Sequence, residues 1–75
     1  MKRYKNLAGD SGVVAYEAGA DWIAVRFRSG EVYRYTHTSA GRRKVEQMKT
    51  LAEAGRGLST FISTSVGDDY DSKSP

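Results

Sequence analysis

The sequence predicts a single small α+β domain, a three-stranded antiparallel meander followed by one long and one short helix packed on one face of the sheet. Two observations support this fold class. Residues 13–36 form three short segments separated by turn residues, and side chains in the second and third alternate with period two. Residues 39–62 instead repeat apolar side chains at helical spacing. No strand is apolar enough to be buried on both sides, so the helices should cover one face only.

The three strands are expected at 13–18, 22–28 and 31–36. The first is β-branched and stops at the turn residues 19–21. The second alternates cleanly, which defines two opposite faces of the sheet. One face carries Ile23, Val25 and Phe27, and the other carries Trp22, Ala24, Arg26 and Arg28. In the third strand, two tyrosines alternate with Val32, Arg34 and Thr36.

The loop between the second and third strands decides which face Tyr33 and Tyr35 share, because a shift of one residue flips every side chain of a strand. A two-residue loop would place both rings on the outer face. A three-residue loop, 28–30, with Gly30 in a left-handed bulge, would place them on the inner face beside Val25. This second register buries two more aromatic rings, each stabilising the fold by about 1.5–3 kcal/mol if fully buried. We therefore expect the three-residue loop.

A long helix is expected over 39–54, with Thr38 or Ser39 as its N-cap. The glycines at 55 and 57 should end it, and one or two further helical turns should begin at Leu58. The polar ends, 1–10 and 67–75, are expected to be flexible tails. This leaves 11–66 as the domain.

Composition excludes several classes of chemistry. With no cysteine, the chain has no disulfide, thiolate metal site or cysteine nucleophile. It shows neither a secretory signal pattern nor an apolar run of membrane-spanning length, so we expect a cytoplasmic protein that does not contact membranes. The net charge is +3, and residues 1–66 carry eleven Lys or Arg against six Asp or Glu. This basic balance is compatible with binding to nucleic acid or another acidic partner, and also with solubility alone.

Catalytic and metal-binding patterns are weak in this sequence. His37 is the only histidine, so nucleophilic catalysis has few partners, and we assign no catalytic residue. There is no histidine pair at ligand spacing, and Asp68, Asp69 and Asp71 lack the glycine and final glutamate of a calcium loop. The glycines match no dinucleotide-binding or phosphate-binding motif. We expect a protein with no enzymatic activity, no metal and no cofactor.

The segments 27–35, FRSGEVYRY, and 55–62, GRGLSTFI, flank the expected long helix in an order that resembles the KTSC domain. This family is named after the C-terminus of certain lysyl-tRNA synthetases and also occurs as free-standing small bacterial proteins. Its motif, a Tyr-x-Tyr after a Phe-x-Ser-Gly turn, is matched here by Phe27, Ser29, Gly30, Tyr33 and Tyr35. The resemblance covers about residues 11–66, although 36–39 depart from the Val-Pro-like helix entry of many members. The synthetase association suggests RNA binding.

One combination of side chains indicates a ligand. The preferred register leaves Trp22, Arg26, Arg28 and Arg34 on the outer face of the sheet. Guanidinium groups there could hold phosphates while the indole stacks on a base. Arg42, Arg43, Lys44 and Lys49 add a basic helical surface suited to contacts with a nucleic-acid backbone. These residues predict RNA or single-stranded nucleic acid as the partner.

Two alternatives stay open. In the first, the arginines bind nothing, and their stems pack over the sheet while their charges pair with Glu17 and Glu31. In the second, the chain is a protein-interaction module, whose partner is another protein or a second copy paired at a sheet edge.

Overall fold

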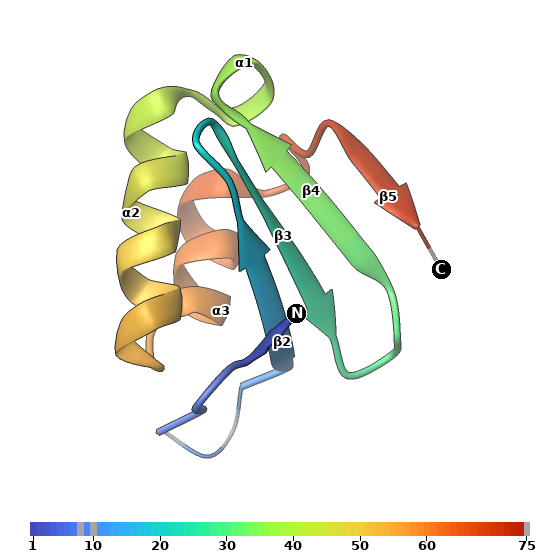
Figure 1. The fold of residues 1–75 in the computed structure, drawn as a ribbon, viewed down its shortest axis with the longest axis vertical. Helices are drawn as coiled ribbons and strands as arrows, with labels where there is room; N and C mark the ends of the chain where they lie inside the picture. Colours follow the sequence, from blue (N-terminus) through green and yellow to red (C-terminus); the bar gives the residue numbers. More distant parts are fainter. Residues whose placement is uncertain (8, 10, 75) are drawn as a thin grey trace.

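The computed structural model describes residues 1–7, 9 and 11–74, which form an antiparallel sheet with helices packed on one face (Figure 1). In chain order the elements are β1 (Lys2–Arg3), β2 (Val13–Ala18), β3 (Trp22–Phe27), β4 (Val32–Thr36), α1 (His37–Ala40), α2 (Arg42–Ala54), α3 (Leu58–Phe61), η1 (Ile62–Val66) and β5 (Ser72–Ser74). The predicted α+β class is confirmed. No helix within the described ranges is long and apolar enough to cross a membrane.

The sheet has five strands in the order β1-β2-β3-β4-β5, so the expected count of three was too low. The predicted meander is its centre, β2 to β4. The two additional strands come from the segments that we expected to be flexible tails. Both strands carry exposed polar side chains and pair with their neighbours through backbone hydrogen bonds. A pattern based on side-chain burial does not detect such strands. The packed part of the chain therefore extends beyond 11–66.

The central hairpin has the preferred register. Val25 pairs with Tyr33 and Ile23 pairs with Tyr35. The loop spans residues 28–30, and its last residue, Gly30, has φ +96°. The amide nitrogen of Gly30 donates to the carbonyl oxygen of Phe27 at 2.9 Å, which closes the turn. Both tyrosines consequently lie on the inner face, toward the helices.

The core lies between this inner face and the helices. Ile23, Val25 and Tyr35 are at most 1% exposed, and they pack with Met48 of α2 and Leu58 of α3. The remaining buried members of this cluster are Tyr4, Val13, Tyr16, Val45, Ala52, Ile62 and Val66.

The helical region begins earlier than expected and is interrupted. Thr36 is the N-cap, since its hydroxyl accepts from the amide of Ser39 while the Ser39 hydroxyl bonds back to the Thr36 amide, forming a capping box. The predicted N-caps, Thr38 and Ser39, lie inside the resulting single turn, α1. Gly41, with φ +95°, then separates α1 from α2, so the expected continuous helix over 39–54 is two helices. After α2, the further helical turns predicted from Leu58 are present as α3 and η1.

Candidate functional site

Part of the predicted site lies together on the outer face of the sheet, which we define by Arg3, Ala15, Glu17, Trp22, Ala24, Arg26, Val32, Arg34 and Thr36. Arg26 and Arg34 sit diagonally on neighbouring strands, because Arg26 pairs with Val32 and Ala24 pairs with Arg34. Both arginines are exposed. Ala24 is only 3% exposed, so its larger neighbours cover the centre of this face.

Trp22 and Arg34 contact each other on the outer face. The guanidinium carbon of Arg34 lies 4.3 Å from the centroid of the Trp22 ring, a cation–π geometry. The indole also lies directly against Gly19, where a Cβ atom would be only 2.0 Å from Nε1 of the indole. Because Gly19 has no side chain, the half-buried indole can occupy this position, where Arg34 covers it.

Sequence reasoning missed Arg3 as a member of this surface. It lies in β1 and pairs with Ala15, which itself pairs with Arg26, so the two arginines occupy one row across the sheet. The first alternative from the sequence pairs the arginines with Glu17 and Glu31. Oε2 of Glu31 instead lies 3.0 Å from Nζ of Lys73. Among the described residues, no ion pair within 4.0 Å includes an arginine of the outer face.

The other predicted basic residues lie elsewhere. Arg28 follows the end of β3, and its Nη2 donates to the carbonyl oxygen of Ser11 at 3.2 Å. Arg42 and Arg43 begin α2, which belongs to the helical layer on the opposite side of the sheet (Figure 1). Lys49 is already bound to the Ala20 carbonyl at 3.1 Å and to a glutamate of its own helix. The structure thus brings together Trp22, Arg26 and Arg34, but not all six candidates.

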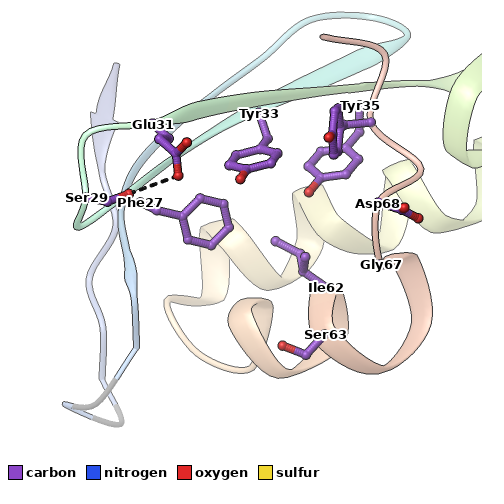
Figure 2. Close-up of a pocket in the computed structure, with 10 residues that line it drawn as sticks. Phe27, Ser29, Glu31, Tyr33, Tyr35, Ile62, Ser63, Gly67 and Asp68 are labelled. Atoms are coloured by element: carbon purple, nitrogen blue, oxygen red, sulfur yellow. Dashed lines mark hydrogen bonds between the residues drawn. The ribbon is translucent and has the colours of Figure 1, made fainter. Parts of the chain in front are cut away.

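A second feature, which we call the tyrosine groove, opens between β4, η1 and the chain that follows η1 (Figure 2). It has a volume of about 550 Å³. Its lining residues are Phe27, Ser29, Glu31, Tyr33, Tyr35, Ile62, Ser63, Gly67, Asp68 and Tyr70. Four of these ten residues are aromatic, and Ser29, Glu31, Ser63 and Asp68 add polar groups.

The aromatic rings of the tyrosine groove meet edge to face. The centroids of Tyr33 and Phe27 are 5.3 Å apart, and those of Tyr33 and Tyr70 are 4.9 Å apart. Tyr35 is 1% exposed, which confirms its predicted place in the core, whereas Tyr33 is half-buried. Burial, with smaller effects of Tyr33 and Tyr70, raises the pKa of Tyr35 to about 12. Its hydroxyl therefore stays protonated at neutral pH.

His37 has a structural contact. Its Nε2 lies 2.9 Å from Oε2 of Glu46, which links α1 to α2. Lys49 bonds to the same oxygen at 2.8 Å, and the hydrogen bonds from Lys49 and then His37 lower the pKa of Glu46. Within the part of the chain that the structure describes, no group of three or more metal-ligating side chains occurs.

No family model, curated protein or solved structure matches the chain. The KTSC resemblance therefore stays a prediction, and functional inference rests on the chain's own geometry.

Proposed function

We propose that the chain is a small nucleic-acid-binding module that holds RNA or single-stranded DNA on the outer face of its sheet. The observation that carries this proposal is the Trp22–Arg34 stack, bordered by exposed Arg26 and by Arg3. Planar cationic and aromatic groups on an open sheet face are the elements that sheet-type single-strand binders use. The proposed mode is sequence-tolerant, because stacking and phosphate contacts discriminate little between bases.

The two groups have different roles in this proposal. The Arg34 guanidinium has the indole against one side, and a base would stack on its other side or displace it from the ring. Arg26 and Arg3 would neutralise phosphates along the strand, a contribution that weakens as salt rises. Glu17 is the carboxylate on this face and would disfavour phosphates near β2.

The homodimer alternative has less support from the geometry. Both edges of the central meander are already paired, one with β1 and the other with β5. Short polar edge strands of this kind oppose further edge-to-edge association. An interaction with a different protein through another surface stays an alternative. It would be favoured if the chain does not bind single-stranded RNA in the titration described next.

The experiment is a titration of a dye-labelled single-stranded RNA with the chain, followed by fluorescence anisotropy at several salt concentrations. We expect saturable binding, which Arg26→Ala with Arg34→Ala weakens strongly, with the salt slope falling by about 0.7 for the one lost phosphate contact of Arg26. The matched control is Arg42→Ala with Arg43→Ala, which removes the same charge from the helical layer. If both double variants lose affinity equally, the outer face is not the binding surface.

A further inference from the structure

The charged side chains that line the tyrosine groove are negative, whereas the chain as a whole is positive. Its two charged lining residues, Glu31 and Asp68, are both acidic, and Figure 2 shows them at opposite ends of the groove. None of the ten lining residues is Lys, Arg or His, although the chain has a net charge of +3. Between these carboxylates lie ring faces and edges, with Ile62 on the helical side. Aromatic surface next to carboxylate is the environment that organic cations prefer in proteins.

The chain itself places a cation at the margin of this groove. Lys73 of β5 pairs with Tyr33 in the sheet, and its Nζ lies 5.3 Å from the centroid of the Tyr33 ring. The same Nζ lies 3.0 Å from Oε2 of Glu31. The hydrogen bond between the two groups lowers the pKa of Glu31 and raises that of Lys73, so both are charged at neutral pH.

We propose that the tyrosine groove is a binding site for a small organic cation, an ammonium or guanidinium group carried on a short apolar stem. The stem would lie along Tyr35, Tyr70 and Ile62, and the cation would face Tyr33 and a carboxylate. A volume of about 550 Å³ lies in the range of small-molecule sites, which are mostly apolar with a few polar groups. Lys73 already contacts the Tyr33 ring and Glu31. Its ammonium group would therefore compete with the ligand for these two groups.

This site is independent of the proposed nucleic-acid surface. Tyr33 and Tyr35 point to the inner side of β4, whereas Arg34 between them belongs to the outer face. The carboxylates of the groove would also repel phosphates, because both groups are negatively charged. The two proposals can therefore fail separately.

The test uses the full-length chain and two nearly isosteric probes, butylguanidinium and the neutral butylurea, titrated while amide and aromatic chemical shifts are followed by NMR. Butylguanidinium should shift the signals of groove residues, and butylurea should not. Glu31→Gln should weaken binding by about two- to fivefold, and Lys73→Ala should strengthen it by a similar factor, because it removes the competing cation. Glu17→Gln, an equal charge change on the outer face, should leave the affinity unaltered.

The unaltered affinity expected for Glu17→Gln separates this proposal from general electrostatic attraction, which the loss of either carboxylate would weaken alike. Equal binding of the two probes, shifts confined to other surfaces, or unchanged affinity in Glu31→Gln would each overturn it.

A third probe, acetylarginine methylamide, distinguishes the origin of the ligand. Tighter binding than butylguanidinium would indicate an arginine side chain of a peptide, and weaker binding a free amine or guanidine. Circular dichroism of both variants confirms that they are folded.

Discussion

The position of the Trp22 indole against residue 19 can be tested by adding one methyl group at that residue. In Gly19→Ala, the new Cβ would lie 2.0 Å from Nε1, 2.5 Å from Cε2 and 2.8 Å from Cδ1 of the indole, whereas ordinary contact starts at 3.4 Å. Restoring that contact moves Nε1 by at least about 1.4 Å, the difference between 3.4 and 2.0. The ring must then leave its present position under the Arg34 guanidinium, which is now 4.3 Å from the ring centroid.

The effect of Gly19→Ala on overall stability should nevertheless be small. Loss of an exposed cation–π contact costs about 0.5–1 kcal/mol. Replacing glycine by alanine at an unstrained backbone position stabilises by about 0.4–1 kcal/mol, because the unfolded chain has fewer conformations. These two terms nearly cancel, and exposing part of the half-buried indole adds a loss, so we expect the free energy of unfolding to fall by about 1 kcal/mol. The environment of Trp22 should change much more than the stability.

Fluorescence measures this directly, because Trp22 is the only tryptophan. Gly19→Ala should red-shift the emission and increase quenching by acrylamide, and urea titration should show the small stability change. Gly12→Ala is the matched control, since its Cβ would meet only Cδ1 of Phe27 at 3.8 Å. It should leave the emission unaltered. An unchanged emission spectrum in Gly19→Ala would refute the placement of the indole against residue 19.

Two further predictions concern the core and the helix end. Because the pKa of Tyr35 is raised from 10 to about 12, its contribution to stability is complete below pH 10 and is lost as the pH rises toward 12. Tyr35→Phe should therefore lose less stability than the unaltered chain between these pH values in urea titrations, and an identical loss would contradict the assignment. Gly55→Ala should destabilise by about 1–3 kcal/mol, since residue 55 has φ +80° and its Cβ would lie 2.6 Å from Cβ of Lys5. Unfolding in urea measures this, and no loss would show that residue 5 does not pack on the helix end.

The centre of the fold was predictable because two local signals agreed. Alternation in β3 defined the inner and outer faces, and Gly30 supplied the positive φ that a three-residue loop requires. Burial of Tyr35 then decided the register, which fixed Arg26 and Arg34 on the opposite face. The sequence pattern therefore predicts that those two arginines and Trp22 share one face of the sheet.

The outer strands and the tyrosine groove were not predictable by the same reasoning. β1 and β5 pair through their backbone and bury none of their own side chains, so polarity alone suggested tails. A tyrosine within each polar terminus was the available signal. Tyr4 is 3% exposed and its hydroxyl accepts from the Leu58 amide at 3.4 Å, and Tyr70 packs against Tyr33 at 4.9 Å. Because these contacts join distant parts of the sequence, no local pattern could specify them.

The single-residue alternation along β4 has an evolutionary consequence. Neighbouring residues on this strand face different environments. Arg34 is exposed to solvent, whereas Tyr33 lines the groove and Tyr35 lies in the core. Substitutions at adjacent codons can therefore tune one surface without altering the other. Insertion or deletion of one residue in the loop at 28–30 would instead exchange the two surfaces and turn arginine toward the helices. Descendants of this gene should vary at residues 28 and 29 but keep Gly30 and the length of the loop.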